Sequence, residues 1–405
     1  MAAYKIICPR CGRELKEEPV YKCLGCRNIV EFYYDFMPSR YERRDAEPGI
    51  FKYADVLPLI DSSSNISLGE GDTPLIASTS IRKEEELENI LFKLEYMNPT
   101  GSFKDRAMAV LMSKASELGL NKAIIASSGN AAASAAAYAA RCGMELIAVV
   151  PETTPDGKTG QILAHGGKIV KVAGLFSESY ALCEELAKRN GWLNLTTTFL
   201  NPYAREGYKT IGYEIFEQLG GSAPDFILIP TGDGPLLASM YEAFEELHQQ
   251  GLVTQMPHLV SVQAANCDPI NESFRSGIPC RELNEGWKPT IASGIDDNLA
   301  GYEDDGDYTV GIIRKSGGMA ISLDEEEIYR SVLKLAQEGV YAEPAGAVCA
   351  IALHELNQQG FFKKNDVIVC LVTGSGLKNS VEVDRKTMSV ARNVHDAEKE
   401  IWEWR

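Results

Sequence analysis

Lys104 is the residue of this 405-residue chain whose position most directly suggests covalent chemistry. Residues 90–95 read as a buried strand, a turn follows, and Ser102 is expected to cap the next helix. Lys104 would then lie in the first helical turn, where the helix dipole disfavours a cation by roughly 0.3–1 kcal/mol. A lysine amine held neutral there can form a Schiff base with an aldehyde. The alternative is that residues 104–106 are simply consecutive charged residues exposed to solvent, without a chemical role.

Two later loops could complete a site around such a lysine. They are Ser127-Ser128-Gly129-Asn130 and Thr231-Gly232-Asp233-Gly234, and a predicted helix follows each of them. Backbone N–H groups at a helix N-terminus bind a phosphate or carboxylate without a basic side chain. Each loop could equally be an ordinary strand-to-helix turn. Thr373, after the last predicted strand, could hydrogen-bond a ring nitrogen or simply belong to a turn.

From residue 120 onward, short apolar strands alternate with helices. The strands are predicted near 123–126, 145–150, 168–172, 226–229, 259–263 and 367–372. The helices are predicted near 130–142, 160–165, 177–190, 202–219, 236–250, 324–338 and 344–358. This pattern is typical of an α/β fold with parallel sheets covered on both faces. Ligands of such folds bind beyond the carboxyl ends of strands, where the loops at 127–130, 231–235 and 373–376 are expected to meet.

Four cysteines near the N-terminus have metal-ligand spacing. Cys8 and Cys11 form one C-x2-C pair, and Cys23 and Cys26 form another. Two such pairs can place four thiolates tetrahedrally around zinc, and four protein ligands leave no open position, so the site would be structural. A redox dithiol and a knuckle without metal are the alternatives.

The composition excludes several classes of protein. The net charge of −17 repels phosphate backbones, so nucleic acid is not an expected partner. No apolar run approaches the ~20 residues that span a bilayer, and the N-terminus has no signal-peptide pattern. The other six cysteines are scattered over predicted buried elements, which suits a reducing cytoplasm. We therefore expect a cytoplasmic enzyme that contacts no membrane.

Several motifs together resemble threonine synthase, a pyridoxal-phosphate enzyme of fold type II. They are Gly69-Glu-Gly-Asp-Thr-Pro74, Asn98-Pro-Thr-Gly-Ser-Phe-Lys104-Asp-Arg106, Ser127-Ser-Gly-Asn130, Asn201-Pro202 with Glu206-Gly207 and Lys209-Thr210, Glu343-Pro-Ala345, and Thr373-Gly-Ser-Gly-Leu-Lys378. The resemblance covers roughly residues 45–380, and some family members carry a similar cysteine ribbon in front. It implies two parallel-sheet α/β domains of the tryptophan synthase β type behind a zinc-ribbon-like segment.

The resemblance also implies how the chain is divided. The ribbon would be residues 1–36, the large cofactor-binding domain 37–107 plus 202–405, and the small mobile domain 108–201. The small domain would close on the large one when substrate binds. Family members are commonly dimers, so a homodimer is expected.

The resemblance assigns roles to individual residues. Lys104 would bind pyridoxal 5'-phosphate covalently and then serve as the general base for a small amino-acid substrate. The other cofactor-binding residues implied are Phe103 beside the ring, Asn130 at the 3'-oxygen, Thr373 at the ring nitrogen, and Thr231, Gly232, Asp233 and Gly234 at the phosphate. The substrate-binding residues implied are Ser127, Ser128, Gly129, Ala131 and Arg205.

The chain departs from the family where phosphate groups should bind. Asp233 and Pro235 stand in a loop that usually reads G-N-G-G-N, so a negative charge is added and an amide donor is lost. Ala131 stands where a threonine is typical. The family's N-P-x-R becomes N-P-Tyr-Ala204-Arg205, which rotates the arginine by about 100° on a helix. The catalytic motifs are intact, but the ligands for the phosphate of O-phosphohomoserine are altered.

Three functions therefore stay open. A threonine synthase would abstract protons from Cα and Cβ, expel phosphate from Cγ and add water at Cβ. A simpler lyase would abstract the Cα proton and expel a β-substituent from an unphosphorylated or β-substituted amino acid, releasing ammonia and a 2-oxo acid or accepting a new nucleophile. A non-catalytic zinc-ribbon binding module is the third, and the intact Lys104, Asn130 and Thr373 oppose it.

Overall fold

A computed structural model describes residues 4–16, 18–34, 47, 49–59, 61–154, 156–173, 176–283, 286–379, 381–382 and 391–403. Its helices are α1 (Ile81–Glu84), α2 (Lys104–Glu117), α3 (Asn130–Cys142), α4 (Asp156–Ala164), α5 (Phe176–Asn190), α6 (Pro202–Gln218), α7 (Pro235–Gln249), α8 (Pro269–Ser276), α9 (Glu303–Lys315), α10 (Glu325–Gln337), α11 (Pro344–Ala347), α12 (Cys349–Gln358) and α13 (Val394–Glu403). In this part of the chain, no helix combines the length and the apolar character that crossing a membrane requires.

The largest sheet has six strands in the order β12-β11-β10-β13-β5-β4. They are β12 (Met319–Leu323), β11 (His258–Ala264), β10 (Phe226–Pro230), β13 (Val367–Leu371), β5 (Asn89–Lys93) and β4 (Leu75–Ala77). All pairings are parallel except that of β4 with β5.

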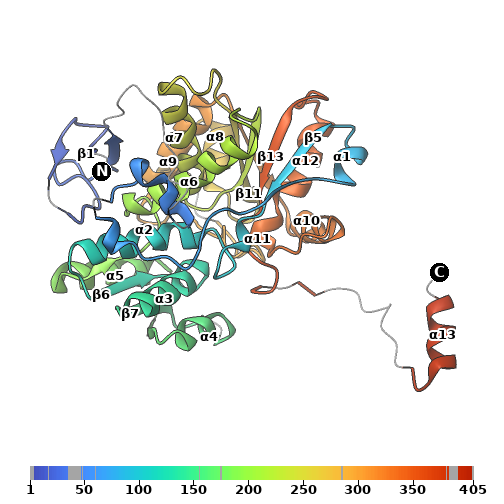
Figure 1. Cartoon of the computed structure of the whole chain (residues 1–405), viewed down its shortest axis with the longest axis horizontal. Helices are drawn as coiled ribbons and strands as arrows, with labels where there is room; N and C mark the ends of the chain where they lie inside the picture. Colours follow the sequence, from blue (N-terminus) through green and yellow to red (C-terminus); the bar gives the residue numbers. More distant parts are fainter. Residues whose placement is uncertain are drawn as a thin grey trace.

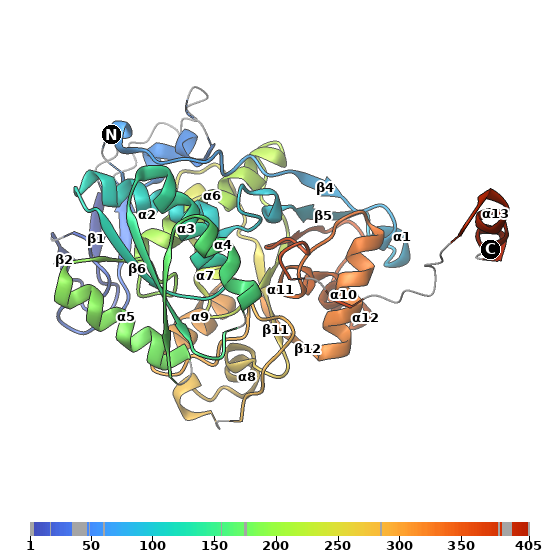
Figure 2. The same cartoon turned by 90° about the horizontal axis from the view of Figure 1, so that it is seen from below.

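Alternate residues of β10 pack into different cores, so this sheet is covered on both faces. Ile227 and Ile229 join the core that contains α6, α7 and α9, whereas Phe226 and Leu228 join the core of α10 and α12. Figure 2 shows α10 and α12 on one side of β11 and β12 and α7 on the other. Burial on both faces explains why β10 is a continuous apolar run in the sequence.

A second, fully parallel sheet has the order β8-β7-β6-β9. Its strands are β8 (Lys168–Val172), β7 (Glu145–Pro151), β6 (Lys122–Ala126) and β9 (Leu193–Asn194). This sheet and helices α3, α4 and α5 form one group of elements in Figure 1. They lie within 108–201, the segment predicted as a small domain, while the domain boundaries themselves stay a prediction. The α/β class with parallel sheets is confirmed.

The N-terminal segment forms a small antiparallel sheet, in the order β2-β1-β3, against the main body (Figure 1). Its strands are β1 (Tyr4–Ile7), β2 (Glu14–Leu15) and β3 (Glu31–Tyr34). The Tyr34 hydroxyl donates to Glu206 on α6, and the Lys22 amine pairs with Asp305 on α9 at 3.1 Å. The segment is therefore bound to the two helices that flank the start of α7.

The expected N-cap at Ser102 is wrong by one residue. Helix α2 begins at Lys104 with Phe103 at the cap, and the buried Ser102 hydroxyl has no hydrogen-bond partner among the described residues. The turn is held by Asp105 instead, because the Thr100 N–H and hydroxyl donate to its carboxylate at 2.6 and 2.5 Å. The Phe103 N–H donates to the Thr373 carbonyl at 3.0 Å, which ties this turn to the loop after β13.

Arg106, two residues after Lys104, is completely buried between two glutamates. Its guanidinium donates to both Glu95 and Glu214 at 2.7–2.8 Å, and Lys93 also pairs with Glu214 at 2.7 Å. Burial disfavours the ionised form of Glu214, but Arg106 and Lys93 outweigh it and hold its pKa far below the usual range. Two buried cations thus balance the charges of two buried anions.

We predict that Arg106→Met lowers the free energy of unfolding by about 3–5 kcal/mol, because Lys93 is then the one cation among the described residues that is left for two buried carboxylates. Lys315→Met is the matched control, since the Lys315–Glu245 pair is exposed and its loss should cost less than about 1 kcal/mol. Urea unfolding followed by circular dichroism measures both. Equal shifts for the two variants would contradict the stabilising role of the buried network.

Candidate active site

A cavity of about 590 Å³ lies where the loops after β6, β10 and β13 meet the first turns of α2, α3 and α7. Nearly all the residues predicted to bind cofactor or substrate line it. They are Phe103, Lys104, Ser127, Ser128, Gly129, Asn130, Ala131, Thr231, Gly232, Asp233, Gly234 and Thr373. The fold thus brings together segments that are up to 270 residues apart in sequence, from 103 to 373.

The Lys104 amine extends into the cavity between a hydroxyl and two aromatic rings. It donates to Thr197 Oγ1 at 3.2 Å and lies 4.6 Å from the Phe103 ring centroid and 5.2 Å from that of Tyr208. Tyr208 is fully buried, and burial raises the pKa of its hydroxyl, although the Lys104 charge opposes this shift. The amine is therefore fixed in position but is held by neutral groups, which leave it available for reaction.

Asn130 and Glu343 both line the cavity and are in direct contact. The Asn130 amide, at the start of α3, donates to Glu343 Oε1 at 2.6 Å. The Glu343 N–H donates to the Gly374 carbonyl at 3.0 Å, so Glu343 is fixed beside the loop that contains Thr373. Thr373 is almost completely buried at the end of β13.

The loop from Thr231 to Gly234 presents backbone amides at the N-terminus of α7. The described residues offer no backbone acceptor to the N–H groups of Gly232, Asp233 and Gly234. Gly234 has a φ of +105°, and a Cβ there would overlap the Thr309 hydroxyl at 1.9 Å, so only glycine allows this loop to pack against α9. Free amides at a helix N-terminus bind an anion such as a phosphate.

Comparisons with known proteins agree with this arrangement. Residues 66–374 match the family model described as pyridoxal-phosphate dependent enzyme. Threonine synthase from Methanocaldococcus jannaschii is 34% identical over 384 residues, which cover 92% of each chain. Threonine synthase from Mycobacterium tuberculosis is 34% identical over 335 residues, which cover 82% of this chain and 89% of that one.

The chain belongs to the threonine synthase-like, fold-type-II family of pyridoxal-phosphate-dependent enzymes. It is a pyridoxal-phosphate-dependent lyase. Solved structures share the fold: maize serine racemase has a TM-score of 0.64 at 22% identity, covering 82% of this chain and 92% of that one. A threonine deaminase isoform from Solanum lycopersicum has a TM-score of 0.63 at 23% identity, covering 81% and 86%.

The residues of the cavity fit pyridoxal 5'-phosphate. An aldehyde needs an amine, and the Lys104 amine projects into the cavity. A phosphate needs N–H donors, and the Gly232 and Gly234 amides of the loop before α7 have no backbone acceptor among the described residues. The Thr373 hydroxyl and the Asn130 amide supply the neutral hydrogen-bonding groups that a ring nitrogen and a phenolic oxygen require. The bound cofactor would supply an electron sink for a carbanion at the substrate Cα.

Thr231 contributes less to this loop than the sequence predicts. Its N–H donates to the Val262 carbonyl and its hydroxyl donates to the Ile229 carbonyl, both at 2.9 Å. Thr231 therefore lines the cavity with both of its donors already used by the neighbouring strands. The Gly232 and Gly234 amides have no backbone acceptor among the described residues, whereas the Asp233 amide hydrogen-bonds its own carboxyl group.

Arg205 lies outside the cavity, contrary to the expectation that it binds substrate. Its guanidinium is buried, pairs with Glu242 on α7 and donates to the Val30 carbonyl of the N-terminal segment. Ala204, its neighbour on α6, is also buried and away from the cavity. The shift of the arginine by one position turns it toward the N-terminal segment, where it fastens that segment to α7.

Several cavity residues were not predicted as site residues. They are Thr196, Thr197, Thr198, Tyr208, Asp296, Asp297, Glu343 and Lys378. Glu343 and Lys378 belong to family motifs and could have been assigned from them. Asp296 and Asp297 follow no strand in the sequence pattern, so only the folded chain shows that this loop reaches the cavity.

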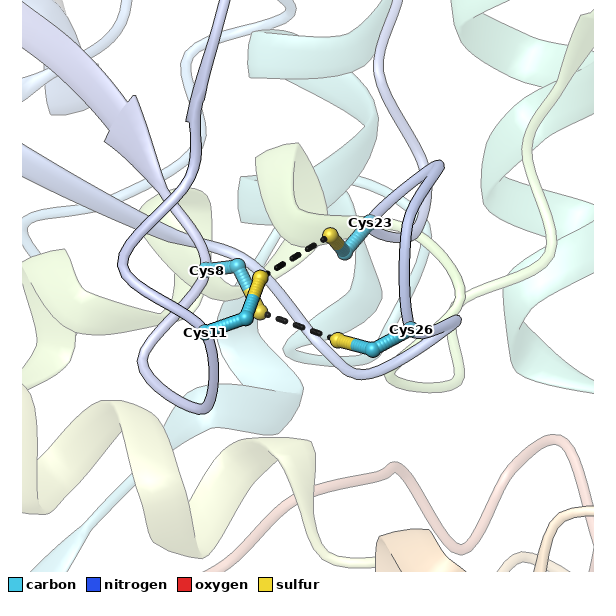
Figure 3. Close-up of side chains that lie close together, drawn as sticks. All are labelled: Cys8, Cys11, Cys23 and Cys26. Carbon is cyan, nitrogen blue, oxygen red and sulfur yellow. Dashed lines mark hydrogen bonds between the residues drawn. The ribbon is translucent and has the colours of Figure 1, made fainter.

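The four N-terminal cysteines converge, as Figure 3 shows. The Cys8 and Cys26 sulfurs are 3.5 Å apart, those of Cys11 and Cys23 are 3.6 Å apart, and all four lie within 4.8 Å of one another. Tetrahedral zinc with Zn–S bonds of about 2.3 Å requires sulfurs about 3.8 Å apart. The cluster could therefore hold a metal with four thiolates, which leave no position for a substrate.

We predict one zinc ion per chain, measured by elemental analysis of the purified protein, and its loss in Cys11→Ser. Cys142→Ser is the control, because Cys142 lies on α3 outside the cluster and should leave the metal content unchanged. Loss of the metal should lower the melting temperature, because the metal-bound segment anchors α6 and α9. Metal-free wild-type protein would refute the zinc assignment.

Proposed function

We propose that this lyase removes a side-chain substituent from an L-amino acid that carries no phosphate group. The observation that carries the proposal is the set of charged side chains lining the cavity. Among the described residues, four carboxyl groups line it, from Asp233, Asp296, Asp297 and Glu343, against two amines, from Lys104 and Lys378.

Both amines already have another role or contact. Lys104 is the residue that would bind the cofactor. The Lys378 amine donates to the Thr100 carbonyl at 2.8 Å, and burial lowers its pKa, although Glu343 and Asp105 oppose this shift. A phosphorylated side chain would bring a dianion toward several carboxylates without a guanidinium to compensate, since Arg205 is bound elsewhere.

The residues present can perform an elimination. The N-terminal amides of α3, with Ser127, Ser128 and Gly129, would bind the substrate α-carboxylate, and Ala131 adds a methyl group where the family typically has a hydroxyl. The Lys104 amine would take the Cα proton. Thr197 and the rings of Phe103 and Tyr208 would keep that amine in place.

The second candidate is threonine synthase itself, acting on O-phospho-L-homoserine. The relatives favour it, because proteins named threonine synthase are 34% identical over 92% of both chains. In that case the phosphate would have to be bound by backbone amides and threonine hydroxyls such as Thr196 to Thr198, which line the cavity.

We also propose that residues 108–201 form the small domain and move toward the large domain, residues 37–107 and 202–405, when the α-carboxylate binds. Asn130 belongs to the proposed small domain and Glu343 to the proposed large domain, and the two side chains are hydrogen-bonded. Closure of the domains would rearrange this contact. Equal scattering profiles of the free and substrate-bound enzyme would contradict closure.

The decisive measurement compares substrates on the cofactor-loaded enzyme. We expect 2-oxo acid and ammonia from an unphosphorylated substrate such as L-serine, L-threonine or a β-substituted alanine. The cavity lacks two charge-assisted hydrogen bonds to a substrate phosphate. We therefore expect kcat/KM for phosphate release from O-phospho-L-homoserine to be roughly 100-fold lower than kcat/KM for the unphosphorylated substrate. Lys104→Ala is the control and should be inactive with every substrate. Efficient, stoichiometric formation of phosphate and threonine would instead establish the second candidate.

A further inference from the structure

The second cysteine pair of the N-terminal segment is attached to two separate parts of the protein. Tyr21 and Lys22 directly precede Cys23, one of the four converging cysteines. The Tyr21 hydroxyl accepts the N–H of Asn194, in β9, at 2.8 Å. The Lys22 amine pairs with Asp305, in the first turn of α9, at 3.1 Å. Two adjacent residues therefore hold a strand of the four-stranded sheet and a helix that packs near the loop before α7.

β9 leads directly to the residue that holds the Lys104 amine. The Asn194 side chain accepts the N–H of Thr196 at 2.9 Å. Thr197, the next residue, accepts the hydrogen bond of the Lys104 amine at 3.2 Å. Thr196 and Thr197 both line the cavity. The hydrogen bond to Tyr21 thus fixes the backbone just before the segment that positions Lys104.

α9 borders the cavity on its other side. Thr309 donates to the Asp305 carbonyl at 3.0 Å and packs so closely on Gly234 that a Cβ there would overlap its hydroxyl. The Asp305 N–H donates to the Tyr302 carbonyl at 2.9 Å. The Tyr302 hydroxyl in turn donates at 2.8 Å to Asp297, which lines the cavity. The position of Asp305 therefore affects both the loop before α7 and the loop before α9.

Lys22 is the one ion-pair partner of Asp305 in the described part of the chain. The Asp305 side chain is 1% exposed, and its Oδ2 has no hydrogen-bond partner among the described residues. A buried carboxylate that loses its cation is strongly destabilised. The start of α9 thus depends on Lys22 remaining where the N-terminal segment places it.

A metal would determine how firmly Tyr21 and Lys22 are held. The turn that follows them contains Cys23 and Cys26, whose sulfurs lie close to those of Cys8 and Cys11. Four metal–thiolate bonds would join the two turns, whereas without them the second turn has mainly its own backbone hydrogen bonds.

We propose that Tyr21 and Lys22 are positioning residues through which a metal bound to the four cysteines preorganises the cavity for an amino acid. With the metal in place, Asn194 and Asp305 are held at the same time. Without it, binding must reorder the segments that carry Thr197 and α9, and this ordering reduces the affinity. The inference rests on the role proposed above for Lys104. It holds for either candidate substrate, because both have the same α-amino and α-carboxylate groups.

The proposal requires coupling between two distinct sites. Couplings between sites are commonly about 5- to 150-fold in affinity, and we expect about tenfold from these two contacts. By thermodynamic linkage, the amino acid must tighten metal binding by the same factor as the metal tightens amino-acid binding. Measurement of both affinities therefore checks the proposal twice.

The test titrates L-alanine into the cofactor-loaded protein, with and without zinc, and follows the cofactor absorbance. L-alanine has the α-groups of a substrate but no substituent to expel, so it binds without elimination. The affinity for zinc is measured by competition with a chromophoric chelator under reducing conditions, with and without L-alanine. We expect each ligand to lower the Kd of the other about tenfold. Cys11→Ser should bind L-alanine like zinc-free wild type.

Two further variants separate positioning from metal binding, because they keep all four cysteines. Lys22→Met and Tyr21→Phe should each bind zinc but reduce the coupling to about threefold or less, and the double variant should abolish it. Lys5→Met and Tyr33→Phe are the matched controls and should keep the full coupling. Lys5 is exposed on β1, and the Tyr33 hydroxyl donates to Glu31 within the same segment. Circular dichroism and melting temperature verify that each protein is folded.

Two results would overturn the inference. Equal affinity of folded wild type for L-alanine with and without zinc would mean that the metal does not act on the cavity. Undiminished coupling in the double variant would assign the coupling to other residues. Efficient formation of threonine from O-phospho-L-homoserine would replace the proposed substrate but leave this test unchanged. An enzyme that performs the proposed elimination without any coupling to zinc would refute this inference alone.

Discussion

The structure depends on the buried charge network around Arg106. This guanidinium is fully excluded from water and bridges Glu95, which precedes the Asn98–Lys104 turn, and Glu214 on α6. A buried charge without its partners costs several kcal/mol, so the turn, β5 and α6 must be in place together or not at all. Gly207 allows this closeness, because a Cβ there would lie 2.3 Å from the Arg106 carbonyl oxygen. The position of the Lys104 amine follows from these contacts.

Buried charged side chains also connect the N-terminal segment to the elements around the loop before α7. Arg205 connects the Val30 carbonyl to Glu242 on α7, and Lys22 pairs with Asp305, whose charge acts on Asp233. An arginine that the family resemblance places at a substrate phosphate thus fastens the N-terminal segment to α7, the helix whose first turn lines the cavity. Moving the arginine by one residue along α6 is enough to change its role, because adjacent helical residues point about 100° apart.

The sequence was most informative where a local pattern determines the result. Apolar strands such as β10 and the glycines of the loops after β6 and β10 predicted the parallel fold and most cavity residues, with Lys104 in the first turn of α2. Long-range contacts could not be predicted in the same way. The position of Arg205 depends on the N-terminal segment, Thr197 reaches Lys104 across 93 residues, and the Ser102 cap was displaced by Asp105, which holds Thr100 instead.

The acids of the cavity have different consequences for the two phosphates that such an enzyme could meet. The phosphate of the cofactor would lie at the N-terminus of α7, where the Gly232 and Gly234 amides have no backbone acceptor among the described residues. A phosphate on the substrate side chain would meet no guanidinium among the described residues that line the cavity, and the Asn130 amide there already donates to Glu343. If the proposed function holds, an acidic cavity would thus accept a phosphorylated cofactor and disfavour a phosphorylated substrate. Such selection would follow from where donors are left unpaired and not from the net charge alone.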